Sequence, residues 1–405
     1  MTVKQYINVL QAVGRIPREC SPRIVWKFVR NFGLRNMTNI RRFEKRQKEG
    51  KPFFPAFVMI SVTESCNLVC SGCWVSYGGK QKLSFKQLDG IITSCKKKGS
   101  YFFGILGGEP LMYPGLLDVL ARHPDCYFQL FTNGTLLTET IAMQLKKLGN
   151  ITPMISIEGM EEESDVRRGK EDVFRRTLEG IRACRKARLI IGAAASIGKS
   201  NFKELVNREY LDLLAKEGVH YLWYYIYRPV GAEPKTANAL DKDQIRQLRK
   251  FIVEQRTSAP LQLVDAYWDD KGSALCPGAV GLSHHISPSG ALEFCPPLQL
   301  AKDFINEEGS NVVELFENST FLAGLRKLTS QTSRGCILLE NPALALQFAR
   351  QQQAVDTTSR GTVEEEMKKM PVLAGHDMKG EEVAEQNVFY RFMKKNYFFG
   401  FGAYG

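Results

Sequence analysis

Three cysteines lie close together in the first fifth of the chain, and their spacing suits metal chemistry. Cys66, Cys70 and Cys73 fall within eight residues, in the segment ESCNLVCSGCW. Iron–sulfur clusters are held by cysteine thiolates, and three ligands leave one iron of a four-iron cluster open to a small molecule. A structural zinc site normally has four ligands, often as paired CxxC units. A zinc knuckle and three unliganded thiols are the alternatives, and the spacing favours an iron–sulfur cluster over both.

A glycine-rich turn with one carboxylate begins 34 residues after Cys73. Its residues are Gly107, Gly108, Glu109 and Pro110. Glycine lets the backbone approach a ligand closely, and a carboxylate can accept a charge-assisted hydrogen bond from an ammonium group. Taken alone, this turn would be an ordinary connection between a strand and a helix.

Together the two motifs resemble those of the radical S-adenosylmethionine (SAM) superfamily, and the resemblance covers residues 56–228. That family carries CxxxCxxC after the first strand of a partial (βα)6 barrel, and GGEP after the second strand. The resemblance implies that the three cysteines hold a catalytic [4Fe–4S] cluster whose open iron chelates SAM, and that Glu109 binds the SAM amino group. One-electron reduction would cleave SAM to methionine and a 5′-deoxyadenosyl radical, which abstracts hydrogen from a substrate.

One position departs from the family, and several polar residues extend the resemblance. The family commonly has an aromatic residue before the third cysteine; here Gly72 stands there, and Trp74 follows Cys73. Polar residues at the ends of later expected strands could contact SAM, although each is equally compatible with a structural role: Asn133, Ser156, Glu158, Ser196 and Arg228.

A second set of cysteines lies far downstream. Cys276, Cys295 and Cys336 resemble the start of a SPASM/twitch extension, in which cysteines around a glycine-turned hairpin hold an auxiliary iron–sulfur cluster. Three ligands are one short of full ligation, so either a histidine from the pair His284–His285 or a bound substrate would complete the site. The alternative is that these are buried thiols. Four further cysteines without partners are expected to be core or half-buried thiols: Cys20, Cys95, Cys126 and Cys184.

The elements expected around these motifs alternate between strands and helices. Six short apolar runs predict strands: Phe57–Val62, Tyr101–Leu106, Tyr127–Phe131, Pro153–Ile157, Leu189–Ser196 and Val219–Tyr227. Helical stretches separate them, a pattern typical of βαβ units in a parallel sheet. Chemistry collects at the carboxyl ends of such strands, where the motifs fall. The predicted fold class is α/β, a partial (βα)6 barrel with a small C-terminal auxiliary-cluster domain.

Charge and composition divide the chain further. The net charge is +12, and residues 1–53 carry thirteen Lys and Arg against three Glu. A basic arm on a nearly neutral body does not suggest nucleic acid as a partner. The expected regions are a basic amphipathic N-terminal arm (1–53), a radical SAM core (54–230), a helical linker (231–272), a SPASM/twitch-like region (273–340) and a helical, aromatic C-terminal tail (341–405).

The absence of an apolar stretch long enough for a signal peptide or a membrane span predicts a cytoplasmic protein. The basic arm and the aromatic tail suggest either peripheral contact with a membrane or caps on the barrel. The leading functional prediction is C–H activation on a small-molecule, lipid or isoprenoid substrate, with a low-potential donor such as flavodoxin or ferredoxin. The alternatives are maturation of a ribosomal peptide or protein by the same chemistry, and a non-catalytic iron–sulfur or zinc protein.

Overall fold

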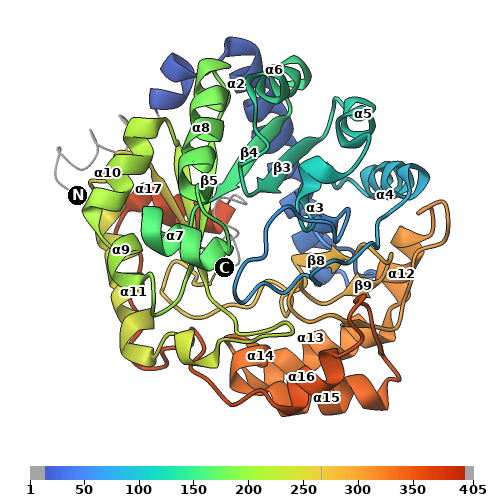
Figure 1. Ribbon diagram of the computed structural model, residues 1–405. Coiled ribbons are helices and arrows are strands. Elements are labelled where there is room, and N and C mark those ends of the chain that lie inside the picture. Colours follow the sequence, from blue (N-terminus) through green and yellow to red (C-terminus); the bar gives the residue numbers. More distant parts are fainter. Residues whose placement is uncertain (1–13, 266, 397–405) are drawn as a thin grey trace.

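A parallel sheet surrounded by helices forms most of the molecule. The computed structural model describes residues 14–265 and 267–396. Its strands are β1 (Phe57–Ser61), β2 (Phe102–Leu106), β3 (Tyr127–Thr132), β4 (Ile151–Ser156), β5 (Gly192–Ile197) and β6 (Tyr221–Ile226). The helices between them are α4 (Phe85–Lys97), α5 (Leu116–Ala121), α6 (Glu139–Leu148), α7 (Glu161–Arg168), α8 (Val173–Lys186), α9 (Phe202–Leu205) and α10 (Arg208–Glu217). These elements confirm the predicted α/β class, and Figure 1 shows the helices around the outside of the curved sheet.

The alternation of side chains along each strand builds two apolar layers. Val58 and Ile60 of β1 are fully buried toward the helices, whereas Phe57 and Met59 face the inside of the sheet. Successive side chains of a strand point to opposite faces, so both faces are apolar, as expected for a parallel sheet covered by helices.

The sheet is longer at both ends than the sequence predicted. Helix α11 (Lys242–Gln255) leads into β7 (Gln262–Asp265), which pairs in parallel with β6. At the other end, β8 (Ser283–Ile286) pairs in parallel with β1 and is followed by β9 (Leu292–Glu293). The expected helical linker therefore contains a strand, and the SPASM/twitch-like region shares the main sheet. Both strands are short, and β8 reads as polar, so neither gave an apolar run.

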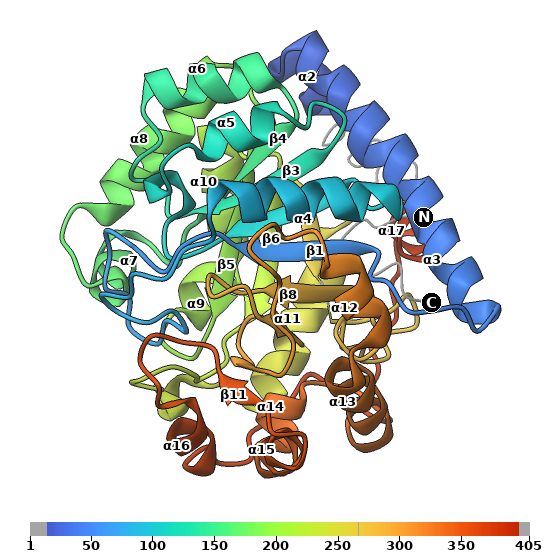
Figure 2. The ribbon, with the colours of Figure 1, turned by 90° about the vertical axis from the view of Figure 1, so that its right-hand side faces the viewer.

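The N-terminal arm caps the amino ends of the strands. It contains α2 (Pro22–Lys27), the π-helix η1 (Phe28–Leu34) and α3 (Arg35–Lys48), which lie along the outside of the molecule in Figure 2. Phe28 and Phe32 stack on each other and pack against Tyr127 at the start of β3. The Asn31 amide donates to the Cys126 carbonyl, 3.2 Å away. These contacts support the capping interpretation of the arm.

The C-terminal third packs helices beside the sheet. They are α12 (Val312–Asn318), α13 (Thr320–Thr332), α14 (Ile337–Glu340), α15 (Pro342–Gln351) and α16 (Val363–Lys368), with a small sheet of β10 (Leu300–Ala301) and β11 (Val355–Asp356). Figure 2 shows helices α13 to α16 together on one side of the molecule. In residues 14–265 and 267–396, no helix has the length and apolar character needed to cross a bilayer.

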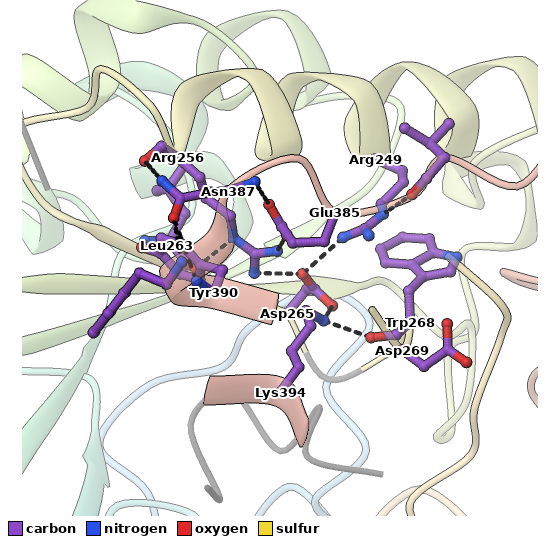
Figure 3. Close-up of polar contacts among 12 residues, drawn as sticks. Arg249, Arg256, Leu263, Asp265, Trp268, Asp269, Glu385, Asn387, Tyr390 and Lys394 are labelled. Atoms are coloured by element: carbon purple, nitrogen blue, oxygen red, sulfur yellow. Dashed lines mark hydrogen bonds and ion pairs between the residues drawn. The ribbon is translucent and has the colours of Figure 1, made fainter. Parts of the chain in front are cut away.

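A buried ionic cluster attaches the last described helix, α17 (Val388–Asn396), to the end of β7 (Figure 3). The Asp265 carboxylate is fully buried and accepts from Arg256 at 2.6 Å, Arg249 at 3.2 Å and Lys394 of α17 at 3.1 Å. Burial alone raises the pKa of Asp265, but the charges of these cations outweigh it and lower the pKa well below its usual range. Glu385 pairs with Arg256 from the other side. The aromatic residues after 396 lie outside the described residues.

Candidate active site

One large cavity opens at the carboxyl ends of the strands. Its volume is about 490 Å³, and both the sheet and the C-terminal region contribute to its wall. All six cysteines of the two predicted sets line it: Cys66, Cys70, Cys73, Cys276, Cys295 and Cys336. The fold thus brings together two sets that are more than 200 residues apart in the sequence.

The first cysteine set lies on the loop after β1. The backbone N–H of Ser71 donates to the Arg167 carbonyl at 2.8 Å, which ties this loop to α7. Burial raises the pKa of the Cys66 thiol and raises that of Cys73 to about 12. A nearby positive charge is needed to stabilise these thiolates, and a bound metal group supplies one, since a thiol that coordinates a metal is deprotonated.

The glycine-rich turn packs directly on that loop. The N–H of Gly108 donates to the Thr63 carbonyl at 2.7 Å, and the N–H of Glu109 donates to the Ser65 carbonyl at 2.8 Å. A Cβ on Gly108 would collide with the carbonyl oxygens of residues 64 and 65, so only glycine allows this approach. The turn therefore fixes its backbone against the segment that carries Cys66.

The Glu109 carboxylate is fully buried beside the cavity, which Gly107 and Gly108 line. Pro110 starts the short 3-10 helix η2 (Pro110–Met112). Glu109 accepts hydrogen bonds from the Thr132 hydroxyl at 2.8 Å and from the Asn133 and Leu111 N–H groups at 2.8 and 3.1 Å. Burial raises its pKa, and these donors offset part of the rise. All three donors are neutral, so a bound cation would stabilise the ionised carboxylate.

The five predicted strand-end residues line the same cavity: Asn133, Ser156, Glu158, Ser196 and Arg228. Glu158 does not present a free carboxylate to it. Its oxygens lie 3.2 Å from Arg167 and 3.3 Å from Arg168, and one of them accepts from the Ser196 N–H at 3.0 Å. Glu158 therefore holds two arginines at the cavity wall.

Sequence reasoning missed those two arginines. Arg168 is 8% exposed and lies 3.7 Å from the Cys70 sulfur, while Arg167 donates to the Ser196 carbonyl at 2.7 Å. In the sequence they read as the basic end of a short charged helix. The signal that could have found them is Glu158, because a buried carboxylate at a strand end needs a cationic partner.

Sequence reasoning also missed the role of Tyr227. Gly72 has a positive φ of 69°, and a Cβ there would collide with the Tyr227 hydroxyl. The Tyr227 ring is also in cation–π contact with Arg167, 5.5 Å from its centroid. An aromatic ring from the end of β6 thus fills the space beside the third cysteine, where the sequence places glycine.

The second cysteine set comes from three separate segments. Cys276 precedes β8, Cys295 follows β9, and Cys336 precedes α14. The Arg228 guanidinium donates from Nε to the Cys336 sulfur at 3.2 Å. It also donates to the Tyr267 hydroxyl at 3.2 Å. Burial raises the pKa of Cys276 to about 11 and also raises that of Cys295, and the charge of Arg228 offsets only part of these rises.

The histidine pair, one of the two alternatives for completing this set, is engaged elsewhere. Both residues belong to β8 and not to a loop, and both are buried. The ring of His285 bonds to Glu293 at 2.5 Å and to the Ser61 hydroxyl at 2.8 Å. The ring of His284 bonds to the Phe294 carbonyl at 2.9 Å and to Arg326 at 3.2 Å. All four ring nitrogens are thus engaged within the protein.

The four cysteines outside the two sets are buried among apolar residues, and the Cys20 sulfur also contacts the Leu189 carbonyl and the His220 ring, each at 3.4 Å. Cys20, Cys95, Cys126 and Cys184 are each 0% exposed. Burial raises the pKa of each thiol. They behave as small apolar side chains, as predicted.

Comparison with known proteins assigns the core of this chain. Residues 60–205 match the model of the Radical SAM superfamily. This range contains the first cysteine set and the glycine-rich turn, so the chain carries a radical SAM domain. The cofactors that such a domain implies are a [4Fe–4S] cluster and SAM.

The individual relatives differ in what they do. The chain is 28% identical over 214 residues to Fe-coproporphyrin III synthase of Methanosarcina barkeri, covering 51% of this chain and 52% of that protein. It is 25% identical over 260 residues to the sporulation killing factor maturation protein SkfB of Bacillus subtilis, covering 62% and 58%. The chain thus spans between half and three-fifths of the length of these two relatives.

The fold also resembles that of solved structures. Streptococcus suis SuiB, in a complex with its precursor peptide SuiA, gives a TM-score of 0.59 at 18% identity and covers 71% of this chain and 70% of its own. This likeness extends beyond the matched segment and therefore includes part of the C-terminal region.

Proposed function

We propose that this protein is a radical SAM enzyme that cleaves SAM reductively and uses the product to activate a C–H bond of its substrate. The observation that carries the proposal is the packing of the Cys66–Cys73 loop on the turn that contains the buried Glu109. The cluster would supply one electron to the sulfonium of SAM.

Different residues of the chain would bind the cluster and the separate groups of SAM. Cys66, Cys70 and Cys73 would ligate three irons and leave the fourth open. Glu109 and the glycines Gly107 and Gly108 would receive the SAM amino group, because the carboxylate is buried and bonded only to neutral donors among the described residues. Arg168, held by Glu158, has the charge to bind the SAM carboxylate.

The polar residues at the ends of β3 to β5 would orient the rest of SAM. Asn133 and Ser156 face the cavity and offer the hydrogen-bonding groups that a ribose requires. Ser196 lies beside them, with its backbone bonded to Glu158 and Arg167. Tyr227 closes the wall next to Cys73 in place of an aromatic residue at position 72.

The second set of thiols would hold one auxiliary iron–sulfur cluster, with Cys276, Cys295 and Cys336 as ligands. The support is their common position on the cavity wall beside Arg228. Because both histidine rings are engaged elsewhere, the fourth coordination site would be left to an exogenous group.

The substrate is proposed to be a peptide or a small molecule with an apolar group. The inner part of the cavity is lined by Phe131, Trp223 and Tyr225, whose rings contact one another at centroid distances of 6.2 and 5.7 Å. An apolar side chain would fit between such surfaces. One relative is named as a sporulation killing factor maturation protein, and the structurally similar SuiB binds a precursor peptide; both favour a peptide over the lipid or isoprenoid of the initial prediction.

Anaerobic purification tests the proposal. The expected result is about four irons from the first cluster, rising to about eight with the second, and formation of 5′-deoxyadenosine from SAM with dithionite. Cys70→Ala should abolish this product. A flavodoxin or ferredoxin should replace dithionite as the electron donor. Stoichiometric zinc without iron would instead indicate a non-catalytic metal protein.

Peripheral membrane contact is proposed for the outer face of the arm. Trp26, Val29 and Leu34 are 60%, 44% and 54% exposed, among exposed arginines such as Arg30 and Arg41. A basic helix face with exposed apolar side chains suits an anionic lipid surface.

Flotation tests this contact, with vesicles of phosphatidylglycerol and phosphatidylcholine as the probe. The wild type should float with vesicles that contain the anionic lipid, and the double variant Trp26→Ser/Leu34→Ser should lose most of that binding. Val372→Ser, at a valine that is 74% exposed elsewhere, should keep it. Equal binding by all three proteins would contradict membrane contact through the arm.

A further inference from the structure

A C-terminal segment, which we name the strap (residues 355–366), crosses from the auxiliary region to the loop of the first cysteine set. It begins as β11, which pairs with β10 through Leu300↔Asp356 and Ala301↔Val355. It ends in α16, whose Val363 and Met367 are buried. Both ends of the strap are thus anchored, and its middle faces the cysteine loop.

That loop needs external support. Residues 62–84 connect β1 to α4 and form no helix or strand; their only bridge is Thr63↔Lys82. Connections this long are uncommon in compact domains unless they carry function. Cys66, Cys70 and Cys73 all lie within it.

The strap makes its first contacts on the near side of the cysteines. The Ser359 N–H donates to the Glu64 carboxylate at 3.1 Å, and the Ser359 hydroxyl donates to the same carboxylate. Glu64 in turn accepts from the Gln81 N–H at 3.2 Å. Glu64 is 5% exposed and precedes Cys66 by two residues. Through Glu64, the strap is therefore connected to both the start of the loop and, at Gln81, its end.

Arg360 makes the contacts on the far side of the cysteines. Its guanidinium donates to the Trp74 carbonyl at 3.2 Å and to the Ser76 hydroxyl at 3.3 Å. Its remaining donors bond to Gln299 at 2.7 Å and to Glu366 at 2.6 and 2.8 Å. A planar guanidinium has five N–H donors and can make all five of these bonds, whereas a lysine ammonium has only three donors.

A second chain of contacts runs parallel to the first. The Thr357 hydroxyl donates to Glu293, which bonds to His285, which bonds to Ser61 at the end of β1. The Trp74 ring packs edge-on against His285, with centroids 5.9 Å apart. Trp74 is thus held at its carbonyl by Arg360 and at its ring by His285.

We infer that Arg360 is a positioning residue for the proposed reaction: it holds Trp74 to Ser76, directly after Cys73, against the auxiliary region and so shapes the SAM end of the cavity. The expected effect on the KM for SAM rests on the proposed function, whereas the expected effect on the mobility of the loop does not. Because both regions share this arginine, movement of one is transmitted to the other.

Arg360→Gln tests the inference, because glutamine keeps a polar side chain but loses the charge and most donors. Arg360→Lys keeps the charge without the fork of donors. The matched control is Arg350→Gln: Arg350 bonds to Glu364 of α16 on the surface, with side chains 48% and 50% exposed, and does not reach the loop.

Hydrogen–deuterium exchange of the metal-free protein is the first measurement. In Arg360→Gln the amides of residues 74–82 should exchange at least about tenfold faster, while those of α13 and α15 stay unchanged. Arg360→Lys should fall between it and the wild type, and Arg350→Gln should match the wild type. Unchanged exchange at 74–82, or equal acceleration throughout the C-terminal helices, would overturn the inference.

Kinetics of the reconstituted enzyme are the second measurement. The KM for SAM in Arg360→Gln should rise several-fold, with a smaller fall in kcat. An unchanged KM together with a lowered kcat would contradict a role in shaping the SAM site. If Arg360→Gln does not fold, Ser359→Ala provides the milder variant with the same expected pattern. Failure of the proposed function would appear separately, as a wild type that does not cleave SAM.

Discussion

The two cysteine sets face one cavity but are assembled in opposite ways. Cys66, Cys70 and Cys73 belong to one loop, and local spacing alone brings them near each other. Cys276, Cys295 and Cys336 are separated by 19 and 41 positions and reach the same cavity wall through the pairing of β8 with β1 and the contact of Arg228 with Cys336. The first set is thus encoded by a short motif, whereas the second depends on the whole C-terminal half. The two should therefore respond differently to perturbation.

The largest expected effect separates the two sets chemically. Cys73→Ser should remove SAM cleavage below detection and lower the iron content by about four, because the proposed SAM-binding cluster would lose one of its three ligands. The auxiliary iron should remain, since its ligands are on other segments. Iron analysis checks the iron content, and chromatography of 5′-deoxyadenosine checks SAM cleavage. Loss of all iron would mean that the two sites are not independent.

The reciprocal change should be milder. Cys295→Ser should lose the auxiliary iron but keep 5′-deoxyadenosine formation within about tenfold of wild type, while product formation from substrate stops. The reason is that Cys295 lies after β9, on a segment separate from the loop of the first set. Electron paramagnetic resonance of the reduced protein should show a single remaining cluster. A variant without any SAM cleavage would refute the independence of the first site.

A third change disturbs the fold that builds the second set. Asp265→Asn removes the anion between Arg249, Arg256 and Lys394, and stranding buried charges costs about 3–5 kcal/mol of unfolding free energy. Denaturant unfolding measures this. Asp212→Asn, at a surface pair with Arg208 that is about half exposed, should change stability by about 0.5 kcal/mol or less.

Asp265→Asn should also affect the two iron sites unequally. Tyr267, two residues after Asp265, contacts Arg228, which donates to Cys336. Auxiliary iron should therefore be lost before iron of the first set as denaturant rises. Simultaneous loss would place both sites in one cooperative unit.

The smallest effect comes from His220, at the amino end of β6. Burial lowers the pKa of His220 to about 4 from 6.5, so below pH 6.5 the unfolded chain binds a proton that the folded protein does not. Stability should therefore fall as the pH drops from 6.5 toward 4, by about 2 kcal/mol at pH 5. Unfolding measured across this range checks it, and His220→Asn should flatten that part of the profile. Both cysteine sets should be affected alike, because His220 contacts neither.

Local signals predicted the first site and most of the sheet. Each of β1 to β6 coincides with a predicted apolar run within a few residues, because a strand buried on both faces is continuously apolar. The strands β7 and β8 were missed because each has only four residues. Strand β8 also contains the polar residues His284 and His285, so neither strand forms a continuous apolar run. The helical stretch expected between the last two strands is two helices, α9 and α10, because Asn207 caps the second through the Tyr210 N–H.

Partners that come from distant segments could not be predicted. Arg360 lies in a polar stretch without a motif, and its contact with Trp74 crosses 286 positions. Such contacts depend on the assembled fold and leave no local pattern.

The pairing of β1 with β8 also has a consequence for biosynthesis. The first strand leaves the ribosome well before residues 283–286, and at typical rates of elongation the delay is roughly 10–40 s. During that interval β8 is not yet available to pair with β1. Ser359, which bonds to Glu64, is synthesised later still. The metal-binding loop can take its final shape only after translation of the strap, so cofactor loading is expected to be a post-translational event.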